Sequence, residues 1–352
     1  MSLYIGVDFH PHQQTVAWCD TQTGEVRTLD LRHNTPQVRL FYQQFPPAIV
    51  GIEASVNAVW FEQMLAELGH ELRVGNPTLI RARARSRHKS DKRDAELILD
   101  LMLKDEFPAI WRRSGESNEI LEILRLRLNL VRQRTQVYNR LQALAHNQGL
   151  TKGKMSTAVF QNRLKNCVVS EASALQRSQL FLLLEHLNQQ IGELELWLRE
   201  RAAADKQVQL LLTQKGVGYL TALCLVNTIG DVRRFSRVSK QVVAFIGLDP
   251  LERSSAGKTR MGGISRAGSF LCRFQVGQAA SLSARYDPKL KGFFKRLSKK
   301  KPKRVAKTAV TRKLLIKLAI MLRDNITAAE FDKRGIAVGN TRTYTRSEMT
   351  AF

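Results

Sequence analysis

Residues 3–9, LYIGVDF, form a short apolar run that favours a β-strand, and a His/Pro turn signal follows it directly. Three similar runs come next: QTVAWCD (residues 14–20), EVRTLDL (25–31) and AIVGIEA (48–54). Beyond them, helical spacing at residues 57–69 and 91–104 flanks a further strand-like run, ELRVG, at residues 71–75. This order of strands and helices predicts a mixed α/β sheet domain at the start of the chain.

Four acidic residues occupy special positions in this pattern. Asp8 lies at the end of the first apolar run and Glu53 at the end of the fourth, so both can emerge at one edge of the sheet. Asp91 and Asp94 are three residues apart at the start of a predicted helix, which places them on one helical face. We therefore expect the four carboxylates to converge.

Clustered carboxylates repel one another unless a hard cation neutralises them. A ligand set of oxygens without His or Cys favours Mg²⁺, with Mn²⁺ as an alternative, and two such ions can polarise a scissile phosphate. Each acid also has an ordinary structural interpretation. Asp8 can be a turn former, Glu53 a surface charge, Asp91 a helix cap and Asp94 a salt-bridge partner.

The composition of the chain favours a nucleic-acid partner. Its 352 residues, 43% of them hydrophobic, predict two or three folded domains. The 56 Lys and Arg residues exceed the 31 Asp and Glu residues, which gives a formal net charge of +25. This field suits a phosphate backbone, and a membrane surface is the alternative with less support.

A dense basic run, RARARSRHKSDKR at residues 81–93, contains Asp91 and ends directly before Asp94. Its cations can deliver backbone phosphates to the acidic site, whereas a solvated helix face is the plainer interpretation. The residues predicted to contact nucleic acid here are Arg81, Arg83, Arg85 and Lys89.

In the middle of the chain, the apolar residues have the spacing of long helices. Residues 117–146 have the spacing of a long amphipathic helix, and a second helix repeats leucine or isoleucine in alternating steps of four and three. The residues of this second seam are Leu180, Leu184, Leu187, Ile191, Leu194 and Leu198. The two helices can form a hairpin within the chain, a dimer contact, or both.

Cysteine usage and the first residues indicate the compartment. The four cysteines are far apart, without a CxxC or Cys/His cluster, so neither a zinc site nor a disulfide framework is predicted. The opening residues lack the features of a signal peptide, and no apolar run is long enough to span a membrane. We expect an unprocessed, soluble cytoplasmic protein that does not associate with membranes.

The last third of the chain is rich in glycine. KGVGYLTA, residues 215–222, predicts a turn between two helices, in which Lys215, Gly216 and Gly218 contact a phosphate backbone; a plain packing joint fits equally well. Farther on, a glycine-rich loop carries two serines among cations. These residues are Ser254, Ser255, Lys258, Arg260 and Arg266. Composition alone favours phosphate contact over nucleophilic attack for the serines, because a serine hydroxyl is a poor nucleophile unless a nearby base or metal removes its proton.

Together these motifs resemble the insertion-sequence 110/1111 group of transposases and the related Piv-type DNA invertases, over nearly the whole chain. The first part is similar through IGVDFH, GIEAS and SDKRDAELI, and the last part through KGVGYLTA, IGDVRRF, FIGLDP and SSAGKTRMGGISRAG. The resemblance implies an α/β RuvC-like (ribonuclease H-like) domain, a helical coiled-coil insertion and a mainly α transposase domain. The corresponding limits are residues 1–110, 111–206 and 207–330, with a tail at 331–352.

The resemblance also implies a chemistry and partners. Asp8, Glu53, Asp91 and Asp94 would form the four-acid set that binds magnesium, and Ser255 would attack DNA to form a phosphoserine linkage. Donor and target DNA would be selected by a bridge RNA from the element itself. The protein would act in the prokaryotic cytoplasm, at the nucleoid, as a dimer that assembles to a tetramer.

Two other functions stay open at this point. The first is a RuvC-like nuclease or resolvase that hydrolyses DNA with a metal-activated water, in which Ser255 only contacts phosphate. The second is a noncatalytic nucleic-acid-binding protein, in which the acids are ordinary surface residues. Protein-capped DNA ends would distinguish the recombinase from the nuclease, and an inactivating Asp8→Asn substitution would exclude the binding protein.

Overall fold

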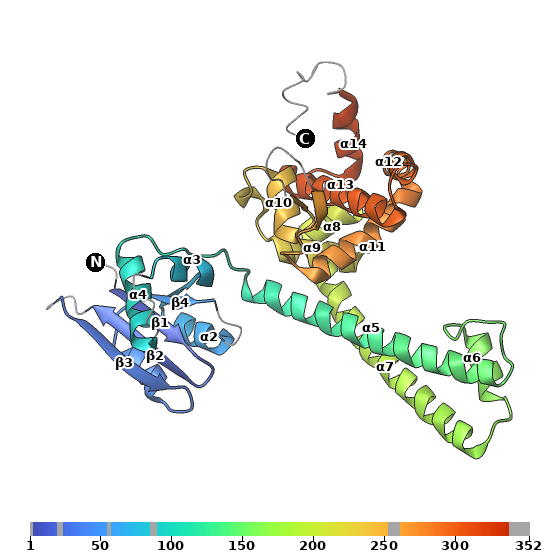
Figure 1. Cartoon of the computed structure of the whole chain (residues 1–352), viewed down its shortest axis with the longest axis horizontal. Coiled ribbons are helices and arrows are strands. Elements are labelled where there is room, and N and C mark those ends of the chain that lie inside the picture. The colour runs from blue at the N-terminus through green and yellow to red at the C-terminus, as the bar shows by residue number, and fades with distance from the viewer. Residues whose placement is uncertain (1–2, 20–23, 55–57, 85–89, 253–260, 338–352) are drawn as a thin grey trace. The chain divides into compact units, whose positions relative to one another are not determined.

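The computed structural model describes residues 3–19, 24–54, 58–84, 90–252 and 261–337, and the chain forms two compact units (Figure 1). The first unit is Met1–Arg112 and the second is Arg113–Phe352. The first is a mixed α/β unit and the second is mostly helical, which confirms the broad fold prediction. The finer domain limits stay predictions. Within the described ranges, no helix is long and apolar enough to cross a membrane.

The first unit is built on one five-stranded sheet with the order β3-β2-β1-β4-β5. The strands are β1 (Leu3–Phe9), β2 (Gln13–Cys19), β3 (Val26–Arg32), β4 (Ala48–Glu53) and β5 (Glu71–Gly75). The pairs β1–β2 and β2–β3 are antiparallel, whereas β1–β4 and β4–β5 are parallel. Strand β1 is therefore central and has a neighbour of each kind.

Helices cover both faces of this sheet. On one face, α1 (Gln37–Gln43) and α2 (Val59–Glu67) pack on a core that includes Val7 and the fully buried Phe61. On the other face lie α3 (Pro77–Ala82) and α4 (Asp91–Leu103), whose buried residues form separate small clusters. The sheet is thus the middle layer of three, which explains why its central strands are apolar on both faces.

Two glycines let α4 approach the sheet. A Cβ atom on Gly6 would lie 2.4 Å from the carbonyl oxygen of Ala95 and 2.5 Å from the backbone nitrogen of Leu99, both in α4. Gly51, the register partner of Gly6 on β4, also faces α4, where a Cβ atom would lie 2.1 Å from Sδ of Met102. The helix backbone therefore rests almost directly on the two parallel strands.

The second unit begins with a helical hairpin. Helix α5 (Gly115–Asn147) runs beside α7 (Glu171–Ala204), and α6 (Ala158–Lys165) lies in the connection between them (Figure 1). Arg127 pairs with Glu195, whereas the later Arg134 donates to the earlier Asn188 at 3.2 Å, so the helices are antiparallel. Leu184 and the other buried leucines of the seam pack on α5 of the same chain. The hairpin interpretation is confirmed, and the dimer contact stays a prediction.

The remainder of this unit is a helical body around one large core. Its elements are α8 (Lys206–Leu212), α9 (Tyr219–Ile229), η1 (Val232–Arg234), α10 (Val238–Ile246), β6 (Pro250–Glu252), β7 (Met261–Ile264), α11 (Phe270–Tyr286), α12 (Pro288–Ser298), α13 (Lys303–Asp324) and α14 (Ala328–Ala337). Two features differ from expectation: β6 and β7 pair as an antiparallel ribbon, and α14 extends to Ala337, within the range 331–352 that was expected to be a tail.

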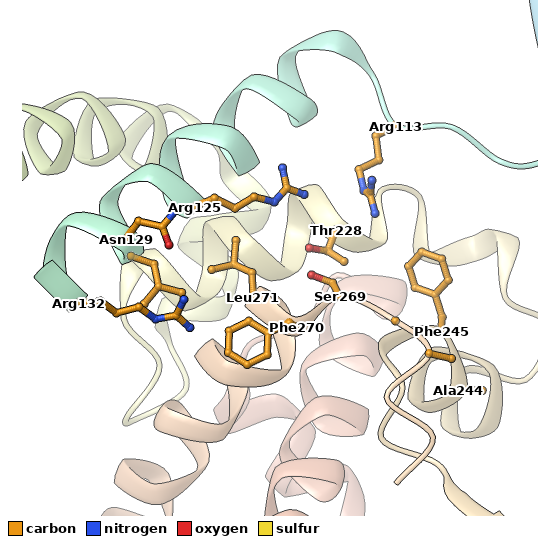
Figure 2. A pocket seen from close by; sticks show the side chains of 13 residues that line it. Arg113, Arg125, Asn129, Arg132, Thr228, Ala244, Phe245, Ser269, Phe270 and Leu271 are labelled. Atoms are coloured by element: carbon orange, nitrogen blue, oxygen red, sulfur yellow. The ribbon is translucent and has the colours of Figure 1, made fainter. Parts of the chain in front are cut away.

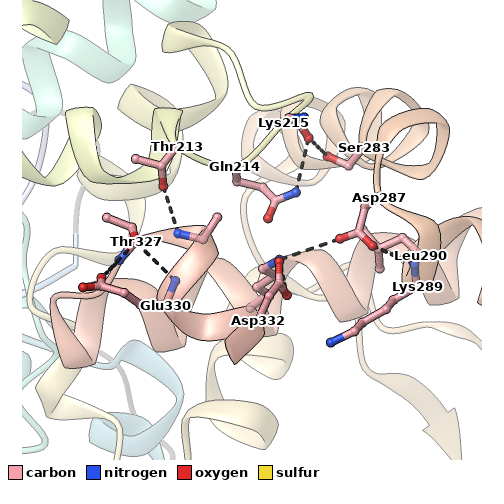
Figure 3. Close-up of polar contacts among 12 residues, drawn as sticks. Thr213, Gln214, Lys215, Ser283, Asp287, Lys289, Leu290, Thr327, Glu330 and Asp332 are labelled. Atoms are coloured by element: carbon pink, nitrogen blue, oxygen red, sulfur yellow. Dashed lines mark hydrogen bonds and ion pairs between the residues drawn. The ribbon is translucent and has the colours of Figure 1, made fainter. Parts of the chain in front are cut away.

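A buried lysine explains why α14 is ordered against the body. Lys317 of α13 lies 2.9 Å from the Asp332 carboxylate of α14 and 3.7 Å from Asp287, which caps α12 (Figure 3). The hydroxyl of Thr213 also accepts a hydrogen bond from the backbone N–H of Ala328 at 3.0 Å. These contacts join residues distant in sequence, so sequence periodicity did not reveal them.

We expect Gly6→Ala to lower the free energy of unfolding of the first unit by about 2–3 kcal/mol, because the new methyl group would overlap the backbone of α4. Gly51→Ala should cost less, because the thioether of Met102 can move aside. Urea unfolding followed by tryptophan fluorescence tests this, since Trp18, Trp60 and Trp111 all lie in this unit. Equal stability of the two variants would contradict the close packing of α4.

We expect Lys317→Ala to destabilise the helical body by about 3 kcal/mol, because it leaves the nearly buried carboxylate of Asp287 without its cation. Lys313→Ala is the matched control on the same helix: Lys313 is exposed and its Nζ lies 4.3 Å from the ring centre of Phe293. Lys313→Ala should lower the free energy of unfolding by less than about 1 kcal/mol. Urea unfolding followed by circular dichroism measures both, and equal losses would refute the role of Lys317.

Candidate active site

The two sheet acids emerge side by side. The last register pair of β1 and β4 is Val7 with Ile52, and Asp8 and Glu53 are the next residue on each strand. Side chains alternate along a strand, so Asp8 shares the face of Gly6, and Glu53 shares the face of Gly51. That face is the one that α4 covers, and both acids therefore belong to the side of the sheet from which Asp91 and Asp94 come.

The start of α4 is fixed by its cap. The hydroxyl of Ser90 accepts a hydrogen bond from the backbone N–H of Arg93 at 3.4 Å, and the first turn contains Asp91 and Asp94. Carboxylates in a first turn are favoured by the helix dipole. The cap and the close approach at Gly6 together determine where these acids meet the sheet edge.

Three side chains come together at this edge: Asp8, His10 and Asp91 each offer a ligand atom within 4.8 Å of the others. Nε2 of His10 lies 3.1 Å from Oδ2 of Asp8 and 3.8 Å from Oδ1 of Asp91. Asp8 is nearly buried, whereas the side chains of His10 and Asp91 are partly exposed. The cluster is thus open to a ligand from one side.

The environment of Asp8 disfavours its negative charge. Burial raises the pKa of Asp8 above its ordinary value, His10 counteracts this shift, and the charges of Asp94 and Asp91 raise the pKa further. A divalent cation would relieve this repulsion, and two carboxylates with one imidazole suit such an ion. The residues present therefore fit a divalent metal.

The other two predicted acids, Asp94 and Glu53, are not part of this three-residue cluster. The charge of Asp94 adds to the effect of burial in raising the pKa of Asp8. Glu53 forms an ion pair with Arg81, with 3.3 Å between Oε1 and the guanidinium, and the Arg81 side chain is 71% exposed. Such an exposed pair is weak, so Glu53 can exchange Arg81 for another cation.

His10 is the residue that sequence reasoning missed. The prediction considered oxygen ligands only, although His10 stands two residues after Asp8 in the quoted IGVDFH. The strand β1 ends at Phe9, and the backbone N–H of His10 bonds to the carbonyl of Gln13 as the chain turns into β2. This turn brings the imidazole back to the sheet edge.

The predicted glycine turn is a packing joint in the structure. Gly216 has a φ of +91°, and a Cβ atom there would lie 2.5 Å from the backbone nitrogen of Ser283 in α11. The hydroxyl of Ser283 donates to the carbonyl of Lys215 at 2.9 Å (Figure 3). Lys215 and Gly218 are exposed, so the predicted phosphate contact stays a prediction.

Two further predicted cations, Arg83 and Arg266, are exposed. Strands β6 and β7 flank the segment that carries the serines, and at their base the hydroxyl of Ser265 donates to the carboxylate of Asp249. The remaining predicted site residues lie outside the described residues: Arg85, Lys89, Ser254, Ser255, Lys258 and Arg260.

Comparison with known proteins identifies the class of protein. A family model described as "Transposase", of the IS110 DEDD type, matches residues 5–147, and a model described as "Transposase IS116/IS110/IS902 family" matches residues 208–295. A "Probable family 20 transposase" of Pseudomonas aeruginosa is 30% identical over 67% of this chain and 71% of its own length.

Two transposases of named insertion sequences are also similar. The transposase for IS1111A of Coxiella burnetii is 33% identical over 53% of this chain and 52% of its own length. The transposase for IS1328 of Yersinia enterocolitica is 27% identical over 75% of this chain and 78% of its own length. The protein is thus a transposase, an enzyme that cuts and rejoins DNA, with a DEDD domain that uses a divalent metal. It belongs to the IS110 family.

We expect Asp91→Asn to weaken Mn²⁺ binding by at least about 10- to 100-fold, because it removes a charged ligand. Loss of a residue that only orients a metal ligand already has an effect of this size. Asp100→Asn is the matched control, since Asp100 lies on the same helix and pairs with Lys104 at 2.6 Å. Electron paramagnetic resonance of free Mn²⁺ measures the affinity. Unchanged binding in Asp91→Asn, or equal loss in Asp100→Asn, would refute the metal site.

Proposed function

We propose that this IS110-family protein is the transposase of an insertion sequence that exchanges DNA strands through two chemical centres. One is the acidic RuvC-like site formed by Asp8, Glu53, Asp91 and Asp94, with Mg²⁺ as the preferred ion and Mn²⁺ as a substitute. The other is Ser255, which acts as the nucleophile. The observation that carries the proposal is the convergence of Asp8, Asp91 and His10 at one sheet edge.

Each residue of the acidic site has its own task. Asp8 and Asp91 bind the cation, and His10 holds the carboxylate of Asp8 through the 3.1 Å contact. Glu53 completes the site when Arg81 turns to a DNA phosphate instead of the carboxylate. Bound Mg²⁺ supplies positive charge that stabilises the oxygens of the reacting phosphate.

At the second centre, the hydroxyl oxygen of Ser255 forms a bond to phosphorus, and the bond from that phosphorus to one deoxyribose oxygen breaks. The serine proton passes to a neighbouring base, and the departing deoxyribose oxygen takes up a proton. The resulting phosphoserine ester keeps the bond energy, so a second DNA hydroxyl can reverse the step and reseal a different strand. Cutting and rejoining then need no external energy source.

Charge supports the proposed partners. A net charge of +25 suits simultaneous binding of donor DNA, target DNA and an RNA from the element. In this proposal the bridge RNA selects the DNA by base pairing, and the protein grips the backbones. A dimer that assembles to a tetramer at the nucleoid brings the acidic site and Ser255 of different protomers to one phosphate.

The same acidic cluster also favours a hydrolytic alternative. Two carboxylates and a divalent ion can activate water, and such a nuclease or resolvase would leave free DNA ends. Serine attack would leave protein-capped ends. The chemical nature of the ends therefore separates the two reactions.

We expect Ser255→Ala to abolish a covalent protein–DNA species while DNA binding stays within about twofold, because only the attacking oxygen is lost. The protein, the element's noncoding RNA and labelled junction DNA are incubated with Mg²⁺ and run on a denaturing gel. Ser254→Ala is the matched control and should keep the adduct. Persistence of the adduct in Ser255→Ala would exclude Ser255, and cleavage without any adduct would favour hydrolysis.

A further inference from the structure

A cationic pocket lies within the helical unit, apart from the acidic site. It has a volume of about 740 Å³ and is formed by α5, α9, α10 and the start of α11 (Figure 2). Three arginines line it: Arg113, just before α5, and Arg125 and Arg132 on α5 itself. Figure 2 shows Arg125 extending toward Thr228, and Arg132 beside the ring of Phe270.

The polar residues of α5 that line the pocket lie in one stripe along the helix. Arg125, Asn129 and Arg132 are four and three residues apart, so they share one helical face beside the buried Leu128. Leu128 and Leu271 supply apolar walls next to the guanidinium groups. Such a surface suits a ligand with an anionic group on an apolar frame, as the sugar-phosphate backbone has.

These positive charges have no carboxylate to balance them in the described structure. Among the residues described, neither Asp nor Glu lines the pocket, and no ion pair involves its three arginines. Burial and the neighbouring Arg125 lower the pKa of Arg113, and its buried Nε atom has no hydrogen-bond partner. An anion in the pocket would stabilise these charges.

The pocket is held in shape before any ligand arrives. A Cβ atom on Gly268 would lie 2.0 Å from the carbonyl oxygen of Phe245, so the loop before α11 is packed tightly on α10. Arg273 fixes the same loop by donating to the carbonyls of Ile246 at 2.8 Å and Gly268 at 2.6 Å. The positive N-terminal end of α11, a 17-residue helix capped by Ser269, opens into the pocket.

We propose that this pocket binds a phosphate of a DNA strand. It adjoins the ribbon of β6 and β7, because Ala267 and Gly268 of the pocket wall follow β7 by only three and four residues. A strand held here would be anchored next to β6 and β7, the strands that precede and follow residues 253–260 in the chain. The binding itself does not require Ser255 to be the nucleophile, because it depends on charge and shape alone.

The test measures affinity for a fluorescein-labelled DNA duplex by anisotropy across a salt series, with EDTA present so that cleavage plays no part. We expect Arg125→Gln and Arg132→Gln each to weaken binding about fivefold and to reduce the slope of log Kd against log salt by about one. Both side chains are exposed, so the fold should persist, and thermal unfolding checks this.

Arg140→Gln is the matched control, since Arg140 is an exposed arginine of α5 that does not line the pocket. Its affinity and salt slope should stay close to those of the parent protein. A loss in the pocket variants beyond that of the control supports the proposal, whether or not RNA affinity falls as well. Unchanged DNA binding, equal loss in Arg140→Gln, or a loss confined to an RNA probe would overturn it.

Discussion

The contact between α4 and the two central glycines is the constraint on which the acidic site depends. Gly6 and Gly51 have no side chain, so the helix backbone comes within contact distance of the parallel strands. The Ser90 cap then fixes the start of that helix at the edge where β1 and β4 end. Without this approach, Asp91 would stand away from Asp8 and no common ligand site would exist.

Electrostatics gives the two halves of the protein opposite tasks. Burial raises the pKa of Asp8 at the acidic edge, the charges of Asp94 and Asp91 raise it further, and this edge would repel DNA without a cation. The pocket of the helical unit concentrates positive charge around Arg113. A phosphate backbone is therefore attracted directly by one site and accepted by the other only through a metal ion, which links DNA cutting to metal binding.

In the helical unit, a buried lysine is stabilised by ion pairs. Lys317 is nearly buried, but it has carboxylates from α14 and from the cap of α12 as partners. Arg113 is different, because the described residues that line its pocket include other arginines and no carboxylate. Because of this contrast, we assign a structural role to Lys317 and a ligand-binding role to Arg113.

The sequence by itself determined the five strands of the first sheet, the helices α2 and α4, the seam of α7 and the places of Asp8, Glu53 and Asp91 at the ends of their elements, because these follow from local periodicity and caps. The resemblance of the motifs also sufficed to predict the transposase family. Only the tertiary structure revealed His10 in the acidic cluster, the ion pair of Glu53 with Arg81, the ordered α14 and the arginine pocket. These features join residues that are brought together by chain turns and helix packing, and no spacing along the chain encodes such contacts.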